Sequence, residues 1–280
     1  MGYTRRYSRS KKQSKRFAFS SLIRTFAGMK RAIVIGATSG IGRQVAQLLI
    51  QNGWHVGMAA RRIETLNELK QIAPERSYIR QIDVTQPGAS DLLLELFNEL
   101  GGANLFFYAA GIGWQNKGLE ESKELQTIET NALGFARMVG TAFRYFAEHA
   151  GGHIAIVSSI AGTKGLGPAP AYSATKALQN TYIQALEQLS HARNLHIQFT
   201  DIRPGFVNTP LLYPDTPDTP ESQASSNKGY PMQMSSRYVA KHIVKAIYRK
   251  KRVIVIDWRW RLVNFLWRLL PNRIWRHIRL

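Results

Sequence analysis

The chain has 280 residues, 44% of them hydrophobic, a formal net charge of +20 and no cysteine. A chain of this length and composition can bury one large α/β core or two small ones, and we expect one. The lack of cysteine excludes disulfides and thiolate metal sites, and it fits a reducing compartment such as the cytoplasm. We expect a site that needs no metal.

The positive charge lies at the two ends of the sequence. Residues 1–28 contain eight Lys or Arg and no acid, and residues 237–280 contain thirteen Lys or Arg and one acid, Asp257. Between them, residues 29–236 hold basic and acidic side chains in equal number. This distribution argues against a nucleic-acid-binding fold and favours basic ends that face an anionic surface.

The sequence divides into three predicted parts. Residues 1–28 are predicted to be a basic, disordered N-terminal extension. They lack the continuous apolar run of a secretory signal, and their Arg- and Ser-rich composition is similar to an organellar transit peptide, which is the alternative. Residues 29–257 are the predicted folded domain, and Met29 is an alternative start because it immediately precedes the first strand. Residues 258–280 are predicted to be a basic, amphipathic helical tail.

From Arg31 onward, apolar strands alternate with amphipathic helices. The apolar runs lie at 32–35, 54–60, 77–84, 103–111, 151–159, 195–205 and 252–257. Helical patterns separate them, which is typical of parallel strands joined by crossover helices. We predict an α/β fold with a doubly wound, Rossmann-type parallel sheet of seven strands and helices on both faces.

Two features of the first half of the chain indicate a dinucleotide site. The first strand is followed by GATSGIG, in which Gly36, Gly40 and Gly42 can bring backbone N–H groups against a pyrophosphate at a helix N-terminus. The second strand ends in Arg61 and Arg62, where a guanidinium can pair with a ribose 2′-phosphate. We therefore predict NADPH in preference to NADH; a solvated arginine pair at a helix start is the alternative.

Three residues can converge on one reacting carbonyl. Tyr172 and Lys176 are four residues apart, so on a helix they share one face, where an ammonium favours ionisation of a phenol. Ser159 ends an apolar strand and could donate a hydrogen bond to a substrate oxygen. Asn131 falls within a mostly apolar helix, where it is either a satisfied structural amide or the holder of a water molecule.

The motifs GATSGIG, DV, AAG, TNALG, SSIAG, YSATK and RPGFVNTP occur in one order along residues 30–257. In this order and spacing the chain resembles the short-chain dehydrogenase/reductase (SDR) family. The resemblance implies a hydride transfer between NADPH and a small-molecule carbonyl or alcohol. We also expect a homo-oligomer without a nucleic-acid partner.

The resemblance also implies roles for single residues. The catalytic set would be Asn131 in a proton relay, Ser159, Tyr172 as acid and base, and Lys176, which would lower the pKa of Tyr172. The implied cofactor-binding residues are Gly36, Thr38, Ser39, Gly40, Ile41, Gly42, Arg61, Arg62, Asp83, Val84, Ala110, Gly111, Tyr172, Lys176, Pro204, Gly205, Val207 and Thr209. The competing hypothesis is a non-enzymatic dinucleotide-binding sensor or scaffold that docks through its basic termini. All four catalytic positions are filled, which favours the enzyme.

Two segments near the C-terminus have open interpretations. Residues 206–235 are rich in Pro, Ser, Thr and Asn and are predicted to close over the substrate. Some apolar residues of this stretch could line an apolar substrate pocket, and a plain packing role is at least as well supported. They are Leu211, Leu212, Tyr213, Met232 and Met234.

In the tail, helical spacing puts one set of residues on a broad apolar arc: Trp258, Leu262, Val263, Phe265, Leu266, Trp267, Leu269 and Leu270. Trp260 lies at the far edge of this arc, and Asn264 lies on the opposite side. Pro271 should interrupt the helix. The arc would dock on the surface of an anionic membrane, or pack on the protein's own body or on a second subunit.

Overall fold

Every strand predicted from the alternating pattern joins one parallel sheet. The computed structural model describes residues 30–212 and 229–278, and the expectations for residues 1–28 and Tyr213 lie outside these ranges. The strand order is β3-β2-β1-β4-β5-β6-β9. The strands are β1 (Arg31–Ile35), β2 (His55–Ala60), β3 (Ser77–Gln81), β4 (Leu105–Tyr108), β5 (Gly152–Val157), β6 (Ile197–Arg203) and β9 (Val253–Val255). The order reverses next to β1, as in a doubly wound fold, and the predicted fold class is confirmed.

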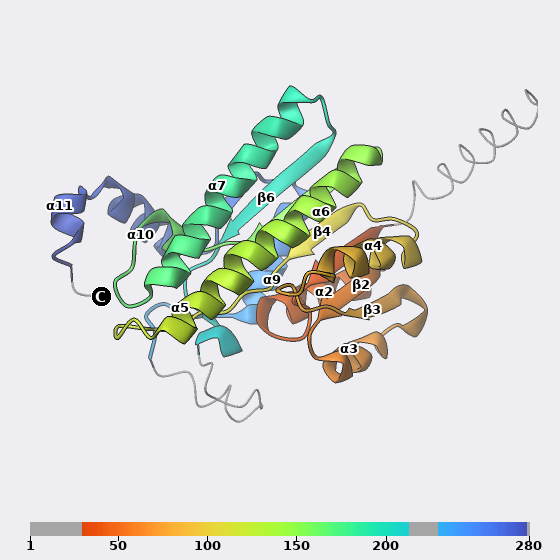
Figure 1. Cartoon of the computed structure of the whole chain (residues 1–280), viewed down its shortest axis with the longest axis horizontal. Coiled ribbons are helices and arrows are strands. Elements are labelled where there is room, and N and C mark those ends of the chain that lie inside the picture. Colours follow the sequence, from red (N-terminus) through yellow and green to blue (C-terminus); the bar gives the residue numbers. More distant parts are fainter. Residues whose placement is uncertain (1–29, 213–228, 279–280) are drawn as a thin grey trace, which may run out of the picture. The chain divides into compact units, whose positions relative to one another are not determined.

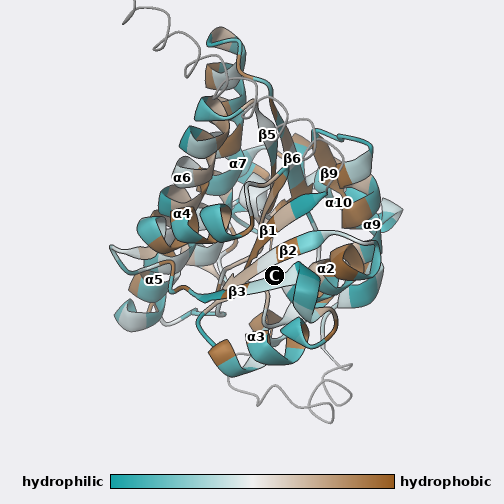
Figure 2. Cartoon of the chain, turned by 90° about the vertical axis from the view of Figure 1, so that its right-hand side faces the viewer, coloured by the Kyte–Doolittle hydropathy of each residue, from teal (hydrophilic) through white to brown (hydrophobic). Residues whose placement is uncertain are grey.

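The first strand explains why the sheet needs a helical layer on each face. All five residues of β1 are buried; Ala32 and Val34 pack into one apolar cluster, and Ile33 and Ile35 pack into another. A strand that is apolar on both faces is stable only between two covering layers. One layer is α2 (Gly40–Gln51), α3 (Ile63–Lys70) and α9 (Ser236–Tyr248), and the other is α4 (Ala89–Glu99), α6 (Phe135–Glu148) and α7 (Pro170–Ala192). Figure 2 shows the sheet between them, with α4 and α6 to the left and α2 and α9 to the right.

The predicted helix around Asn131 contains a π-helical turn. This turn, Glu129–Gly134, joins α5 (Glu121–Ile128) to α6. A π turn adds one residue to the helix and often marks a functional site. Asn131 lies inside the turn and is fully buried. The turn therefore places a polar side chain in the interior of the protein, on a helix face that is otherwise mostly apolar.

The segment that we expected to close over the substrate is ordered at both of its described ends. Two short strands pair in parallel, β7 (Val207–Asn208) and β8 (Met234–Ser235). Val207 and Met234 are buried in the same cluster as α2 and α9, and Met232 packs against it. These two methionines therefore follow the packing alternative. Leu211 and Leu212 are partly exposed in a 3₁₀ turn.

The predicted tail helix forms and ends as the sequence indicates. It consists of α10 (Trp258–Leu269), followed by the short α11 (Asn272–Trp275). Asp257 caps α10 by accepting a hydrogen bond from Arg259 N at 2.9 Å, and Pro271 separates the two helices. Figure 1 shows α10 and α11, in dark blue, at the end of the sheet where α7 begins. In the described parts of the chain, no helix is long and apolar enough to cross a membrane.

The predicted apolar arc of the tail is divided between two faces of α10. The buried residues of the helix are Trp260, which we placed at the far edge of the arc, and Asn264, which we placed on the opposite side. The Trp260 indole fills the space beside Gly205, where any Cβ would collide with it, and Trp260 Nε1 donates to Met232 O at 3.1 Å. The structure therefore corrects the prediction: helical spacing grouped the apolar residues, but a gap at Gly205 determined which face packs inward.

The buried His153 should make the stability of the fold depend on pH. Burial, reinforced by the charge of Lys250, lowers the pKa of His153 to about 4, and its Nε2 lies 2.8 Å from Thr200 Oγ1. Between pH 6.5 and 4 the unfolded chain binds a proton here that the folded chain does not bind. We therefore expect the free energy of unfolding to decrease with falling pH by up to about 3 kcal/mol from this residue.

Urea unfolding of the wild type and of His153→Gln at pH about 7, 6 and 5 measures this contribution. The variant should lose stability less steeply as the pH falls. His149→Gln changes an exposed histidine and should keep the wild-type slope. Equal slopes in all three proteins would contradict the assignment.

Candidate active site

The carboxyl ends of the central strands bring the predicted catalytic residues together. Ser159 follows β5, and Tyr172 and Lys176 lie one turn apart near the start of α7. Pro170 begins that helix, since a proline in the first turn has no N–H that would need a partner. α7 packs against the 3₁₀ turn Ile160–Thr163, which directly follows Ser159. The three side chains therefore lie at one edge of the sheet.

The phenol of Tyr172 is held in its protonated form. Burial raises the pKa of Tyr172 to about 12, and a hydrogen bond with the Ser159 hydroxyl lowers it by a smaller amount. Ser159 is itself buried, and its Oγ accepts a hydrogen bond from Ala161 N at 3.0 Å. At neutral pH, Tyr172 is therefore a proton donor beside a second hydroxyl.

The neighbouring serine has a different environment. Ser158 Oγ donates to Asp201 Oδ1, and Asp201 forms a buried ion pair with Arg203, with 2.6 Å between Oδ2 and Nη2. A buried charge pair of this kind needs every remaining oxygen to have a hydrogen bond. Ser158 thus completes a structural network beneath the site, whereas Ser159 is the serine that contacts Tyr172.

Lys176 directs its hydrogen bonds away from the phenol. Its Nζ donates to Val157 O and to Gln179 Oε1, both at 3.0 Å, and lies 5.7 Å from the centroid of the Tyr172 ring. Burial lowers the pKa of Lys176 to about 8, and the Asp201 carboxylate opposes this shift. Burial of the phenol is the largest influence on the pKa of Tyr172, and the expected lowering of that pKa by Lys176 stays a prediction.

The amide of Asn131 is fully engaged by the protein. Its Oδ1 accepts from Ile112 N at 2.9 Å, and its Nδ2 donates to Ile112 O at 2.7 Å and to Thr175 Oγ1 at 3.3 Å. The side chain therefore fixes the backbone beyond β4. Its main-chain carbonyl accepts a hydrogen bond from Gln179 Nε2 at 2.8 Å.

Sequence reasoning missed two residues of the site. Gln179 is fully buried and bridges the Lys176 ammonium and the Asn131 carbonyl. Gly113 lies against Tyr172, where an added Cβ would come within 2.6 Å of the ring atom Cδ2. Gln179 could have been predicted from its position, because an amide three residues after Lys176 lies on the same face of the helix. Nothing in the sequence around Gly113 distinguishes it from a loop glycine.

We expect Gln179→Leu to lower the free energy of unfolding by about 1–3 kcal/mol, because two buried groups lose a hydrogen-bond partner. The Lys176 ammonium also loses an acceptor, so its pKa should fall further. We expect kcat/KM to decline at high pH as Lys176 loses its proton, and we expect this decline to begin at lower pH in the variant.

The adjacent Asn180 offers a matched control. It is buried on the same helix, and neither of its amide atoms has a hydrogen-bond partner among the described residues. Asn180→Leu should therefore keep or raise the free energy of unfolding and leave the pH profile unchanged. If the two variants behave alike, Gln179 is an ordinary packing residue.

The glycine-rich loop leaves the first turn of α2 open to an anion. Gly36 has a φ of +84°, and a Cβ there would lie 2.6 Å from Ala110 N, so only glycine fits between the ends of β1 and β4. Ser39, the N-cap residue, makes no side-chain cap hydrogen bond within the described chain, and the first turn contains no acid. Such free N–H groups fit the pyrophosphate of a dinucleotide. The other predicted loop residues are Thr38, Gly40, Ile41 and Gly42, which form the turn and the start of α2.

The arginines after β2 lie beside this loop. Arg62 Nη2 donates to Thr38 Oγ1 at 3.2 Å, which joins the end of β2 to the phosphate loop. Arg61 is exposed, and its carbonyl accepts from Gln81 Nε2 at 2.8 Å. Both arginines therefore come directly after the end of β2, where we expected the adenosine ribose of the cofactor to bind.

The remaining predicted residues lie at the ends of β3 and β4. Asp83 Oδ1 accepts from Thr85 N at 3.0 Å and from Thr85 Oγ1 at 2.8 Å, so this carboxylate also has a local turn-forming role. Val84 is buried. Ala110 and Gly111 follow β4, and a Cβ on Gly111 would lie 3.1 Å from the side-chain oxygen of Asn131.

The segment Pro204–Thr209 connects the two halves of the site. Pro204 O accepts a hydrogen bond from Ser159 Oγ at 3.4 Å. At the other end, the Thr209 methyl group lies 2.9 Å from the position of a Cβ on Gly40. The segment therefore runs from Ser159 to the predicted phosphate loop.

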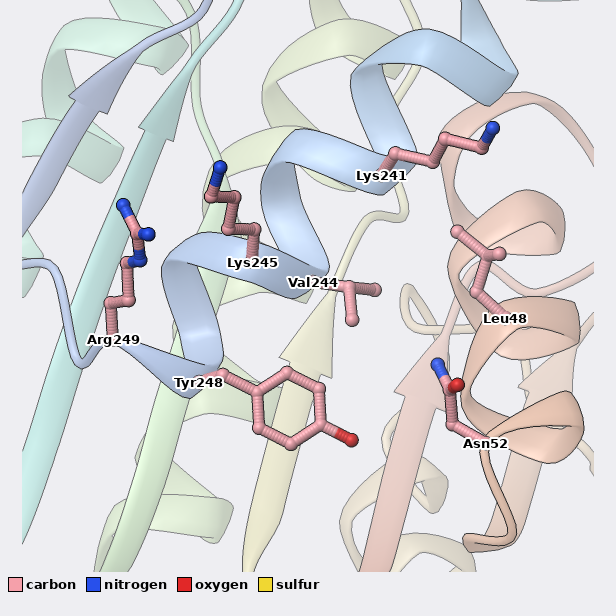
Figure 3. Close-up of a pocket in the computed structure, with 7 residues that line it drawn as sticks. All are labelled: Leu48, Asn52, Lys241, Val244, Lys245, Tyr248 and Arg249. Atoms are coloured by element: carbon pink, nitrogen blue, oxygen red, sulfur yellow. The ribbon is translucent and has the colours of Figure 1, made fainter.

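A separate groove lies between α2 and α9. It has a volume of about 390 Å³ and is lined by Leu48, Asn52, Lys241, Val244, Lys245, Tyr248 and Arg249. Figure 3 shows Val244 and Tyr248 of α9 pointing toward Leu48 of α2 and toward Asn52, the residue that follows α2. Leu48 and Asn52 lie at the C-terminal end of α2, whereas the predicted phosphate loop precedes that helix. None of the predicted site residues lines the groove, so it is distinct from the candidate active site.

A family profile described as short chain dehydrogenase matches residues 30–219. The chain belongs to the short-chain dehydrogenase family. Two relatives of this short-chain dehydrogenase are named uncharacterized oxidoreductases. The Myxococcus xanthus protein is 30% identical over 249 residues, which cover 87% of this chain and 93% of the relative. The Mycobacterium tuberculosis protein is 28% identical over 267 residues, which cover 88% and 96%.

Solved structures share the fold of this short-chain dehydrogenase. A variant of actinorhodin polyketide ketoreductase with NADPH has a TM-score of 0.68 and 24% identity, and the match covers 81% of this chain and 95% of that one. An alcohol dehydrogenase from the archaeon Thermococcus sibiricus, complexed with 5-hydroxy-NADP, has a TM-score of 0.66 and 20% identity, covering 81% and 96%. A serine dehydrogenase complexed with NADP⁺ has a TM-score of 0.67 and 24% identity, covering 80% and 92%. By family, the chain is a dinucleotide-dependent oxidoreductase.

Proposed function

We propose that this short-chain dehydrogenase is an NADPH-dependent carbonyl reductase, able to oxidise the corresponding alcohol in reverse. The observation that carries the proposal is the pair of adjacent hydroxyls, Ser159 and Tyr172, with a protonated phenol. A carbonyl oxygen has two lone pairs and can accept a hydrogen bond from each hydroxyl. The substrate is then a small molecule with a ketone or aldehyde group that reaches this edge of the sheet.

The segment Pro204–Thr209 would help to hold NADPH, which when bound would supply the hydride that the carbonyl carbon accepts. As negative charge develops on the substrate oxygen, Ser159 and Tyr172 stabilise it through their hydroxyl hydrogens. Tyr172 then transfers its proton to that oxygen, and the alcohol is formed. Lys176, whose Nζ lies 5.7 Å from the centroid of the Tyr172 ring, would stabilise the tyrosinate that remains until solvent returns the proton. The reverse reaction needs an ionised phenol at the start.

We expect Tyr172→Phe to lower turnover by orders of magnitude while NADPH binding stays nearly unchanged. Only the transition state needs the phenolic hydroxyl, whereas the ring itself is kept. NADPH oxidation with a panel of ketones and aldehydes, together with a fluorescence titration of NADPH, measures both quantities. Tyr182→Phe, on the same helix, is the control and should keep wild-type turnover.

Two outcomes would oppose this proposal in different ways. Near-normal turnover in Tyr172→Phe would remove Tyr172 from the mechanism. Tight NADPH binding by the wild type, with no turnover of any carbonyl or alcohol, would favour the alternative of a dinucleotide-binding sensor or scaffold.

The cofactor preference follows from the arginines after β2. Arg62 already contacts Thr38 of the phosphate loop, and Arg61 is exposed beside it. A 2′-phosphate adds charge that a guanidinium can bind through two hydrogen bonds. The NADPH and NADP⁺ complexes of the structurally similar proteins agree with this choice.

We expect Arg61→Ala combined with Arg62→Ala to weaken NADPH binding by roughly 1–3 kcal/mol per lost charged hydrogen bond, or about 5- to 150-fold. NADH binding should change little, because NADH lacks the 2′-phosphate. Titrations with both cofactors measure the effect, and Arg193→Ala, an exposed arginine after α7, is the control. Equal losses for the two cofactors would mean that these arginines do not recognise the phosphate.

The domain boundaries, the role of Asn131, the location and the oligomeric state are also part of the proposal. We assign residues 29–257 to catalysis and residues 258–280 to a tail, and the relay role of Asn131 stays a prediction. The cytoplasmic location also stays a prediction. Light scattering during size-exclusion chromatography would test the expected homo-oligomer.

A further inference from the structure

The inner face of α10 attaches the tail to the body of the protein. Besides the contact of Trp260, Trp267 Nε1 donates to Thr163 Oγ1 at 2.9 Å. Just beyond the helix, Lys164 Nζ donates to Leu270 O at 2.8 Å. These bonds hold α10 against the 3₁₀ turn after Ser159. The opposite face of the helix is therefore turned outward.

The outward face is apolar. We define the outer stripe as the exposed hydrophobic residues of the tail: Trp258, Leu262, Phe265, Leu266, Leu269, Ile274 and Ile278. Their side chains are between 40% and 67% exposed. At about 100° per residue, the α10 members lie within an arc of roughly 100°. A continuous exposed apolar surface is typical of a site that contacts something else.

The described tail residues after Asp257 carry charges of one sign. Arg261, Arg268, Arg273 and Arg276 are exposed, and the described tail contains no acid after Asp257. Asp257 is itself paired with Arg259, with 2.9 Å between Oδ2 and Nη2. Two copies joined through this face would bring like charges together at the edge of the contact. The surface is therefore complementary to an anionic partner rather than to itself.

We infer that α10 and α11 dock the protein on the surface of an anionic membrane. Leucine, phenylalanine and tryptophan side chains enter the boundary between headgroups and acyl chains, and arginines remain at the headgroups. Apolar area and charge act together, since neither alone gives stable attachment at ordinary salt. The inference does not depend on the proposed reaction.

The position of the tail gives this docking a consequence for the active site. α10 packs against the turn Ile160–Thr163, and Trp260 contacts Gly205 in the predicted cofactor segment. Figure 1 shows α10 at the same end of the sheet as the start of α7. A docked tail therefore holds the catalytic edge of the sheet next to the lipid surface.

Co-sedimentation of the full chain with lipid vesicles tests the inference. Vesicles with about 30 mol% phosphatidylserine in phosphatidylcholine should bind it, and pure phosphatidylcholine vesicles should bind it more weakly. At about 0.5 M salt, where the screening length is about 4 Å, binding to the anionic vesicles should weaken.

Variants separate the two contributions. Leu262→Ser with Leu266→Ser should lower the partition coefficient about 10- to 100-fold, because two apolar side chains no longer enter the membrane. Ile72→Ser with Leu94→Ser changes two exposed aliphatic residues on the body of the protein and should leave binding unchanged.

A second variant and its control measure the contribution of charge to vesicle binding. Arg261→Ala with Arg268→Ala should lower the partition coefficient about 30-fold. Lys117→Ala with Arg193→Ala removes the same net charge from exposed sites on the body and should have an effect of less than about threefold.

A spectroscopic measurement identifies the face that enters the lipid. Trp258 is the most exposed large hydrophobic residue of the described chain, at 67%. Lipids brominated on their acyl chains should quench tryptophan fluorescence when the wild type binds. Trp258→Phe should lose most of that quenching while it keeps its binding.

Two results would overturn the inference. One is unchanged binding in the Leu262→Ser, Leu266→Ser variant, because the basic segment 1–28 or another surface would then account for attachment. The other is a wild type that ignores vesicles and forms an oligomer that this variant loses, because the outer stripe would then join two copies. Circular dichroism should first verify that each variant is folded; these side chains point outward, so we expect wild-type spectra.

Discussion

A buried ammonium must have hydrogen-bond acceptors, and the site of this short-chain dehydrogenase is built around that requirement. Lys176 on α7 takes one acceptor from Val157 at the end of β5 and another from Gln179 on its own helix. Gln179 then donates to the carbonyl of Asn131, whose side chain fixes Ile112 beyond β4. Two strand ends and two helices are therefore positioned by one charge and the chain of hydrogen bonds that solvates it.

The same burial acts in opposite directions on the two titrating groups of the site. It raises the pKa of Tyr172, whose charged form is an anion, and lowers the pKa of Lys176, whose charged form is a cation. At neutral pH both groups nevertheless carry their protons. The Asp201 carboxylate, paired with Arg203 beneath the sheet edge, limits the loss of charge at Lys176. A buried ion pair outside the reacting centre thus helps to set the protonation state within it.

Trp260 joins the tail to the predicted cofactor segment, where it packs against Gly205 and Phe206. The Trp260 indole occupies the space that a side chain at Gly205 would need, and Gly205 lies between Pro204 and the residues that reach the phosphate loop. Close packing of this kind means that neither element can move far without the other. The amphipathic tail is therefore part of the structure that surrounds the site, and its outward face is positioned by that packing.

The fold class, the strands and the grouping of Ser159, Tyr172 and Lys176 could be predicted from the sequence, because they depend on local periodicity and residue order. The phosphate loop, inferred from glycine spacing, stays a prediction. Features that depend on contacts between distant residues could not be predicted in this way. The role of Gln179 required the carbonyl of a residue 48 positions away. The face of α10 that packs inward could be identified only from the space at Gly205, which Trp260 fills. Helical spacing gives the angles of side chains around the helix axis, but it does not say which side contacts the body of the protein. The direction of the Tyr172 pKa was likewise decided by burial, which no spacing of residues along the chain can supply.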